Sequence, residues 1–196
     1  MLNYKKSSTL IFCLCLMLSW PAQAVSQTCL SAEQYPDDWP ASRYEDHNNG
    51  TVTDTKTGLM WKVCSEGEVF NFYACTTSSY ACIERHSCTG TVSSHTWQSA
   101  LALATTFNSG GGYASYKDWR VPNVVELSSL VKWNCSRPSL NQFVFTDTFG
   151  SKYWSSSPSP DPSFSAYAWG VGFEHGQDFN DYRSQTNFVR LVRSGQ

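Results

Sequence analysis

The sequence predicts an exported α+β domain with two short helices, a meander of short antiparallel strands and several disulfides. Three observations lead to this prediction. The middle of the chain carries two amphipathic helical patterns, and from Tyr153 onward large and small side chains alternate. An even number of cysteines follows an N-terminal export signal. Helices followed by a run of strands are typical of the α+β class.

Residues 1–24 are expected to be a signal peptide. Lys5 and Lys6 form a basic start, Leu10 to Leu18 is an apolar run, and Ala22-Gln23-Ala24 is a typical cleavage site. The apolar run is shorter than the ~20 residues that a membrane-spanning helix needs, and no second apolar run follows. We therefore expect cleavage near Ala24, no membrane insertion, and a protein of the periplasm, the medium or the cell surface.

The charge of the chain argues against nucleic acid as a partner. The formal net charge is −2, and the mature chain is more acidic because Lys5 and Lys6 leave with the signal peptide. No basic run remains after the leader, so the electrostatic footprint of a nucleic-acid-binding protein is missing. A highly sulfated polyanion would equally require a basic patch.

Six cysteines follow the signal peptide, and an even set in an exported chain favours disulfides. Zinc binding is the alternative, but no Cys-x-x-Cys occurs and only His86 lies near the cluster. A polar loop between two of the cysteines suggests a local bridge, with the other pairs nested around it, although other pairings are formally possible. The expected pairs are Cys75–Cys82, Cys64–Cys88 and Cys29–Cys135.

The first half of the mature chain predicts few regular elements. Residues 25–49 are polar and are expected to form an N-terminal arm, and residues 50–196 the domain. Residues 50–54 and 59–63 predict two strands joined by a turn in which Gly58 takes a positive φ. The Cys-rich residues 70–90 predict an irregular lobe.

Two helices are expected next. Thr96 is a good N-cap for a helix whose apolar face carries Trp97 and Ala100, and Gly110-Gly111-Gly112 ends it. Asn123 and Glu126 have the spacing of a capping box for a second, shorter helix after Pro122. Their roles are therefore expected to be structural.

The last part of the chain predicts strands. Tyr167, Trp169, Val171 and Phe173 alternate with Ala168, Gly170 and Gly172, so one face of this strand is nearly bare. Such a face allows another backbone or a stacked ring to come close. Residues 174–177 predict a turn, residues 178–183 a return strand or loop, and residues 188–192 a last strand.

Five aromatic-rich phrases occur in one order along the chain. They are Thr57-Gly58-Leu59-Met60-Trp61, Asp118-Trp119-Arg120-Val121-Pro122-Asn123, Tyr153-Trp154-Ser155-Ser156-Ser157-Pro158, Ala168-Trp169-Gly170-Val171-Gly172-Phe173 and Val189-Arg190-Leu191-Val192-Arg193. Their order and spacing resemble the bacterial DUF1566, or Lcl C-terminal domain, family from about Gly50 to Arg193. The resemblance implies a C-type-lectin-like domain, distantly related in shape to the formylglycine-generating enzymes, and a role in adhesion or glycan binding.

The sequence shows no catalytic or cofactor-binding pattern. The histidines have no paired spacing, Ser155-Ser156-Ser157 lacks a recognisable base, and every mature cysteine has an expected partner. Asp46-His47-Asn48-Asn49-Gly50 loosely resembles a calcium loop, but it has one carboxylate and is equally a turn signal. We therefore expect neither metal nor cofactor, and an enzyme of unknown reaction is the least favoured function.

Aromatic side chains are abundant, at 15% of the chain. Trp119, Trp133, Trp154 and Trp169 are expected mostly in the core. Two loops mix aromatic with short polar residues, a composition typical of recognition surfaces. The simpler interpretation is that their rings close the ends of the core. The predicted binding residues are Phe179, Asn180, Asp181, Tyr182 and Arg183, with Ser159 to Ser165 as the second candidate loop.

These observations favour an exported, non-catalytic recognition or adhesion module that binds a glycan or a cell-surface protein. The alternative is a structural, self-associating subunit of a surface or pilus-like assembly. The two differ in solution, since self-association makes the mass depend on concentration.

Overall fold

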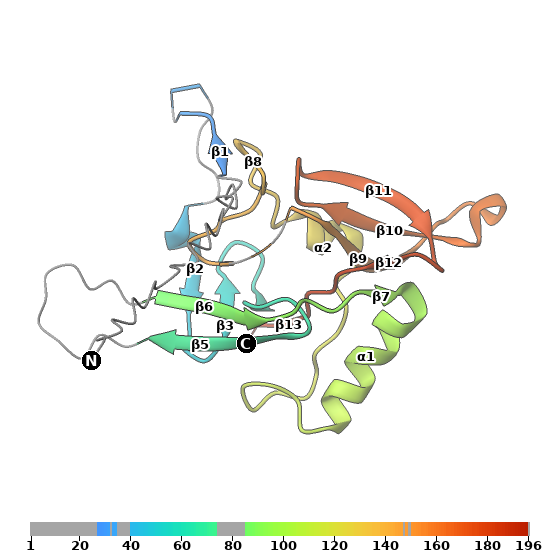
Figure 1. The fold of residues 1–196 in the computed structure, drawn as a ribbon, viewed down its shortest axis with the longest axis horizontal. Helices are drawn as coiled ribbons and strands as arrows, with labels where there is room; N and C mark the ends of the chain where they lie inside the picture. The colour runs from blue at the N-terminus through green and yellow to red at the C-terminus, as the bar shows by residue number, and fades with distance from the viewer. Residues whose placement is uncertain are drawn as a thin grey trace, which may run out of the picture.

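The computed structural model describes residues 27–31, 33–34, 40–73, 85–146, 148 and 150–195 (Figure 1). The expected signal peptide, Cys75 and Cys82 lie outside the described residues. Short strands dominate, with two α-helices and two 3-10 turns. In chain order the elements are β1 (Thr28–Cys29), η1 (Ala41–Arg43), β2 (Tyr44–Asp46), β3 (Thr51–Asp54), β4 (Leu59–Lys62), β5 (Glu68–Tyr73), β6 (Arg85–Gly90), β7 (His95–Thr96), α1 (Trp97–Ser109), α2 (Val124–Ser128), β8 (Cys135–Ser136), β9 (Lys152–Pro158), η2 (Pro162–Phe164), β10 (Tyr167–Gly172), β11 (Gln177–Tyr182), β12 (Thr186–Asn187) and β13 (Val192–Ser194).

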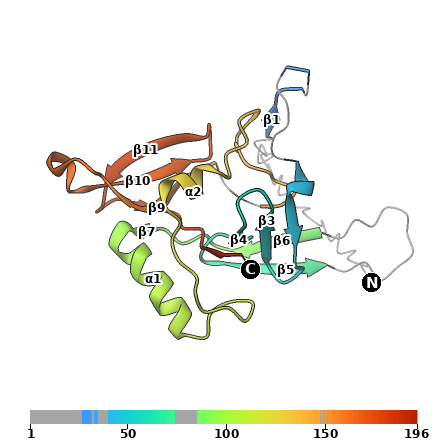
Figure 2. The same ribbon diagram turned by 180° about the vertical axis from the view of Figure 1, so that it is seen from behind.

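The strand pairs of all five sheets are antiparallel. The two largest sheets have the orders β13-β4-β3-β2 and β11-β10-β9, and three further pairs are β1-β8, β12-β7 and β5-β6. Both views place the β10–β11 hairpin at the opposite end of the molecule from the β5–β6 ribbon (Figures 1 and 2). The α+β class predicted from the sequence is thus confirmed as a mixed domain of mostly antiparallel strands with two short helices.

The predicted β3–β4 hairpin and both helices are confirmed. Gly58 adopts φ +70° in the hairpin turn, the conformation for which glycine has no steric cost. Thr96 caps α1 by accepting a hydrogen bond from the Ser99 amide. Asn123 and Glu126 form the complete capping box of α2, so their predicted structural roles are correct.

Three sequence predictions need correction. Residues 68–73 and 85–90 are not an irregular lobe, because they form the ribbon β5–β6 on either side of the segment outside the described residues. The predicted last strand at 188–192 is wrong, because only Val192 belongs to a strand, β13. Phe188 forms an isolated bridge with Tyr153, and residues 189–191 are irregular. Trp133 is not in the core, since 53% of its surface is exposed.

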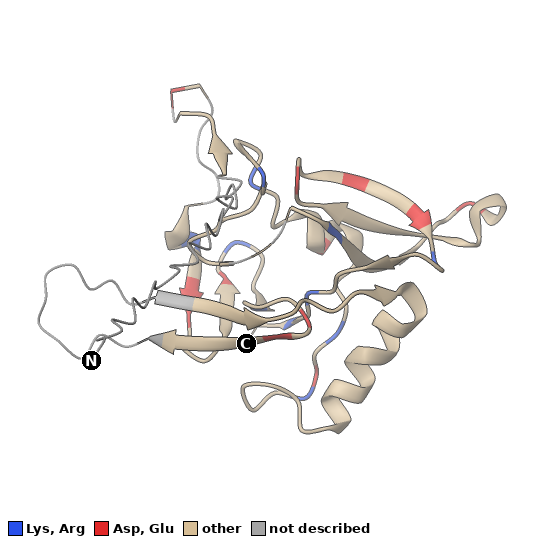
Figure 3. Ribbon diagram, in the orientation of Figure 1, with Lys and Arg blue, Asp and Glu red and all other residues tan. Residues whose placement is uncertain are grey.

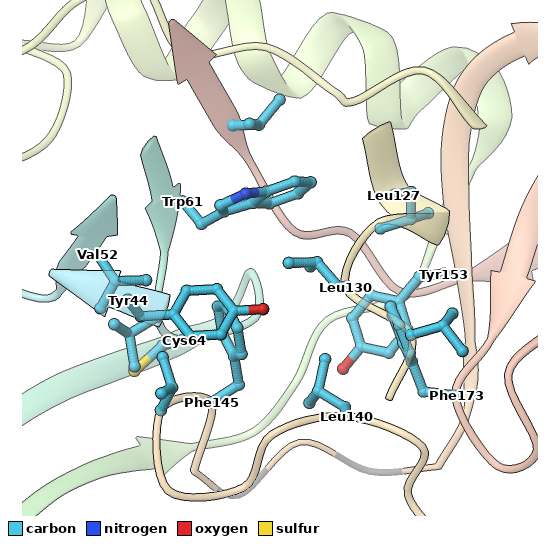
Figure 4. Close-up of a cluster of buried hydrophobic side chains, with 14 of the residues drawn as sticks. Tyr44, Val52, Trp61, Cys64, Leu127, Leu130, Leu140, Phe145, Tyr153 and Phe173 are labelled. Carbon is cyan, nitrogen blue, oxygen red and sulfur yellow. The ribbon is translucent and has the colours of Figure 1, made fainter. Parts of the chain in front are cut away.

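The three-stranded sheet is packed on both faces. Successive strand residues point to opposite sides, and in β9 Tyr153 joins one buried cluster while Trp154 joins another. The first cluster also contains Trp61, Leu127 and Phe145 (Figure 4). The second contains Trp119 and Leu191 and receives the small-residue face of α1 at Ala100 and Ala104.

Arg190 is fully buried and connects the C-terminal segment to the end of β4 and to Thr148. It donates to the Lys62 carbonyl at 3.0 Å, to the Val63 carbonyl, and to the Thr148 hydroxyl at 2.6 Å. Burial lowers its pKa. Arg193 donates to Asp118 at 2.7 Å, and this hydrogen bond lowers the pKa of that carboxyl. The terminal phrase of the sequence is therefore structural.

Two disulfides connect distant parts of the chain, Cys29–Cys135 and Cys64–Cys88. Both are pairs of the nested arrangement proposed from the sequence. Disulfides persist in oxidising compartments, so they indicate an extracellular or periplasmic protein. Within the described ranges, no helix is long and apolar enough to cross a membrane.

Candidate functional site

The β10–β11 hairpin presents aromatic side chains on the face that α2 covers only in part. The register pairs Tyr167 with Tyr182, Trp169 with Asn180, and Val171 with Asp178. Paired residues share a face, and so do residues two apart along a strand. Val171 is buried in the first cluster, and Asp178 accepts a hydrogen bond from Ser128 of α2 at 2.9 Å. The remaining residues of this face, which α2 does not cover, are at least partly exposed to solvent.

The open part is a continuous group of rings. The rings of Tyr167 and Tyr182 lie 4.1 Å apart at an interplanar angle of 33°, and Phe164 meets the edge of Tyr167 at 5.5 Å. Tyr182 is 50% exposed and Phe164 is 46% exposed. A contiguous exposed aromatic group is unusual on a soluble protein and is typical of an interaction site. We call this group the aromatic face; it consists of Phe164, Tyr167, Trp169, Asn180 and Tyr182.

The structure separates the five predicted binding residues. They do not lie in a loop, because residues 177–182 form the edge strand β11. Strand alternation then places Asn180 and Tyr182 on the aromatic face and Phe179 and Asp181 on the opposite face. Only two of the five predicted residues therefore lie on one surface.

Phe179 and Asp181 are occupied by contacts within the protein. The Phe179 ring lies over Gly170, where a Cβ atom would overlap it, and 5.9 Å from the ring of Trp154. This arrangement is the close ring approach expected of the glycine face. Lys152 lies 4.8 Å above Phe179 and pairs with Asp181 at 3.2 Å. Both residues hold the hairpin against β9.

Arg183 is also committed to the fold. Its guanidinium carbon lies 4.3 Å from the centre of the Trp97 ring, and its Nε donates to the Tyr167 carbonyl at 3.0 Å. The carbonyl of Arg183 accepts from the Trp97 amide at 3.0 Å. Arg183 thus connects the hairpin to the start of α1 rather than offering a cation to a ligand.

The second candidate loop joins the first to make one surface. Asp161 caps the short turn η2 through the Ser163 amide at 2.8 Å. This turn directs Phe164 onto Tyr167. The two loops appeared as alternatives in the sequence, but the hairpin brings their aromatic residues together.

Acidic residues lie near the aromatic face. Asp178 is on the same face of the hairpin and Asp161 caps the adjacent turn η2. Acidic segments are visible along β11 (Figure 3). Lys152 is the only lysine or arginine within β9, β10 and β11, and it lies on the opposite face. The hydrogen bond with Tyr182 raises the pKa of Tyr167, and the charge of Asp181 acts in the same direction. The phenol group of Tyr167 is therefore neutral at physiological pH.

A cavity of about 480 Å³ lies between α1 and the segment that precedes α2. Arg120 and Asn123 line it together with Glu126. The Arg120 guanidinium donates two hydrogen bonds of 2.7 Å to Glu126, and these hydrogen bonds lower the pKa of the carboxyl. Glu126 also completes the N-terminal cap of α2. The Arg120–Glu126 pair therefore has a structural role.

Four of the hydroxyl and imidazole side chains that could suggest catalysis have partners within the fold. Ser155 donates to the Trp169 carbonyl at 2.7 Å, and Ser157 accepts from the Val124 amide at 3.0 Å. His47 bonds Thr53, and His95 bonds Ser93, each at 2.8 Å. The Asp46 carboxylate accepts the Asn48 amide at 2.8 Å, as in a turn.

The sequence analysis did not predict that Tyr167 contacts Tyr182, or that Phe164 contacts Tyr167. It also assigned Trp169 to the core. Trp169 is only partly buried. The period-two pattern of residues 167–173 was the available signal, since it already placed Tyr167 and Trp169 on one face. Which face stayed open depended on α2, whose position the pattern does not contain.

Comparison with known protein families identifies the family of the chain. No curated protein matches the chain. The sequence pattern that defines the Lcl C-terminal domain matches residues 50–193. Since that match spans most of the chain, the protein belongs to the Lcl C-terminal domain family, as its five phrases indicated.

Proposed function

We propose that the protein is an exported, non-catalytic recognition module that binds a glycan at a cell surface through the aromatic face. The observation that carries this proposal is the Tyr167–Tyr182 pair, whose rings are stacked and, at Tyr182, half exposed. Aromatic rings with two rotatable angles lose little entropy on binding, and short amides beside them supply adaptable hydrogen bonds. Sugar rings bind to surfaces of this composition by stacking their C–H faces on the aromatic rings.

We further propose that the domain has a C-type-lectin-like frame. Two short helices, antiparallel strands and disulfides that join distant segments are consistent with it. In such a fold, the buried side chains of the aromatic-rich phrases support the sheet. Ligand contacts come from the β10–β11 hairpin, which projects from it.

A double variant tests the proposal. Tyr182→Ala with Asn180→Ala removes one exposed ring and one exposed amide without touching the core. We expect it to remain folded by circular dichroism and to lose about 1–3 kcal/mol of binding free energy, the usual range for a hot-spot aromatic. Phe143→Ala is the matched control, because Phe143 is 88% exposed at a different site.

The ligand is first found on a glycan array, run with and without EDTA to test for calcium, and affinity is then measured by calorimetry. Wild-type binding that the double variant retains would refute the site. An empty array together with a mass that rises with concentration in light scattering would favour the self-associating subunit. An empty array with capture of a defined cell-surface protein would favour protein recognition instead.

A further inference from the structure

We infer that the aromatic face binds an uncharged oligosaccharide lengthwise, with neighbouring sugar rings over the Tyr167–Tyr182 pair and over Trp169. This inference rests on the proposed function and specifies the ligand class of the same site. It follows from the spacing of the rings, the position of one amide, and the distribution of charge.

The spacing provides two ring positions rather than one. Tyr167 and Trp169 are two residues apart on β10 and share a face, which separates their Cα atoms by about 7 Å. That separation is close to the width of one sugar ring. Phe164 extends the row at the Tyr167 end. A row of rings suits successive units of a chain, whereas a single terminal sugar requires a compact pocket.

Asn180 lies beside the Trp169 ring position, on the neighbouring strand. It is paired with Trp169 across the hairpin and is two residues from Tyr182 on β11. Its exposed side-chain amide makes no hydrogen bond to any described residue, so it has both a donor and an acceptor for a ligand. Sugar hydroxyls both donate and accept, and an amide can satisfy two adjacent hydroxyls at once.

The charge of the surface selects an uncharged chain. Asp178 lies on the same face, and Asp161 caps the adjacent turn η2. Lys152 lies on the opposite face and pairs with Asp181, and the Arg183 guanidinium packs on the ring of Trp97. A sulfated or carboxylated polysaccharide would therefore meet repulsion from the carboxylates, without a lysine or arginine among the residues of the aromatic face.

The test compares neutral and anionic chains of equal length by calorimetry. The neutral ligands are chito-, cello- and manno-oligosaccharides from the monosaccharide to the hexasaccharide, and the anionic ligands are heparin oligosaccharides. We expect at least one neutral series to gain about tenfold in affinity from the monosaccharide to the trisaccharide and then to level off. We expect this affinity to be insensitive to added salt, because no ion pair forms.

Two variants of Trp169 test the lengthwise position. Trp169→Ala should lose most of the gain in affinity from the monosaccharide to the trisaccharide, whereas Trp169→Phe should keep that gain. Circular dichroism checks that both remain folded. Equal affinity for all lengths, or a gain that survives Trp169→Ala, would refute the lengthwise arrangement.

Different results would refute the proposed ligand class and the proposed function. Preference for heparin with salt-dependent affinity would refute an uncharged ligand, yet would leave the proposed function intact if Tyr182→Ala abolished that binding. Failure to bind any neutral series would also refute the inference. Heparin or array binding that is unaffected by Tyr182→Ala would refute the proposed site as well.

Discussion

The ring of Tyr182 in β11 lies 4.1 Å from the ring of Tyr167 in β10, and the two residues are directly paired across the hairpin. Each ring shields one side of the other, so both can stay partly in water with a fixed orientation. Offset aromatic pairs of this kind contribute about 0.5–1.5 kcal/mol beyond their buried area. The pair therefore serves both the stability of an edge strand and the rigidity of the candidate site.

Replacing Trp154 by Ala should destabilise the protein by about 3–5 kcal/mol, because it removes a large buried side chain and leaves a cavity. Trp154 has no exposed surface, and its indole nitrogen donates to the His95 carbonyl at 2.7 Å. Trp133→Ala is the control and should cost less than about 1 kcal/mol, since Trp133 is largely exposed. Urea denaturation measures both, and similar losses would show that burial of Trp154 is not what stabilises the sheet.

Gly170→Ala should destabilise by about 1–3 kcal/mol, the usual cost of overpacking. A Cβ at this position would overlap the Phe179 ring and the Tyr153 carbonyl oxygen, which cannot move independently of β9. Gly172→Ala lies on the same face of the same strand, where the nearest atom is the Gln177 carbonyl at 3.6 Å. This control should change stability by less than about 1 kcal/mol. If the two variants unfold at the same urea concentration, Phe179 does not require the glycine.

The stability of the fold should fall in acid through Asp54. Burial alone would raise the pKa of this carboxyl, but hydrogen bonds from Arg43, Thr57 and the Lys56 amide hold the pKa below its usual value. The unfolded pKa is about 4. The stabilisation by Asp54 is therefore fully present at neutral pH and is lost as the pH falls below about 4 toward the folded pKa.

Asp54→Asn tests this pH dependence. The variant should be less stable at pH 7 by on the order of 3 kcal/mol, because it breaks a buried ion pair with Arg43. It should also lose part of the acid sensitivity. Glu45→Gln, on the adjacent strand β2 and exposed, is the control and should keep the wild-type pH profile. If the stability of Asp54→Asn falls with pH in parallel with that of wild type, other carboxyls are responsible for unfolding in acid.

All six mature cysteines should be oxidised. Alkylation without reductant, followed by intact-mass measurement, should add no label, whereas two or more labelled thiols would contradict the expectation and reopen metal binding. Reduction should lower the melting temperature, and loss of Cys29–Cys135, which spans 106 residues, should cost more than loss of Cys64–Cys88, which spans 24. The chain-entropy relation predicts roughly 3–5 kcal/mol for each bridge.

Local patterns in the sequence were sufficient for elements whose determinants are close together along the chain. The cap at Thr96, the capping box at Asn123 and the glycine turn at Gly58 each depend on side chains within a few residues, and all three are present. The alternation from Tyr167 to Phe173 likewise specified which side chains share a face, because the strand period is two. The acidic residues and the absence of a basic run were readable before any fold was known.

The tertiary structure determined which parts of the protein each face of the β10–β11 hairpin contacts. Residues 179–183 have the composition of a binding loop, but pairing with β10 makes residues 179–182 part of strand β11 and directs Phe179 into the space left by Gly170. The position of α2 determines that Val171 is buried while Tyr182 remains exposed, and the packing of Arg183 on the Trp97 ring commits this side chain to the fold. These outcomes depend on contacts between segments far apart in sequence, whose free energies arise only when the chain is folded. The residue types of the aromatic face were therefore encoded locally, whereas long-range packing determined which of the predicted residues lie on that face.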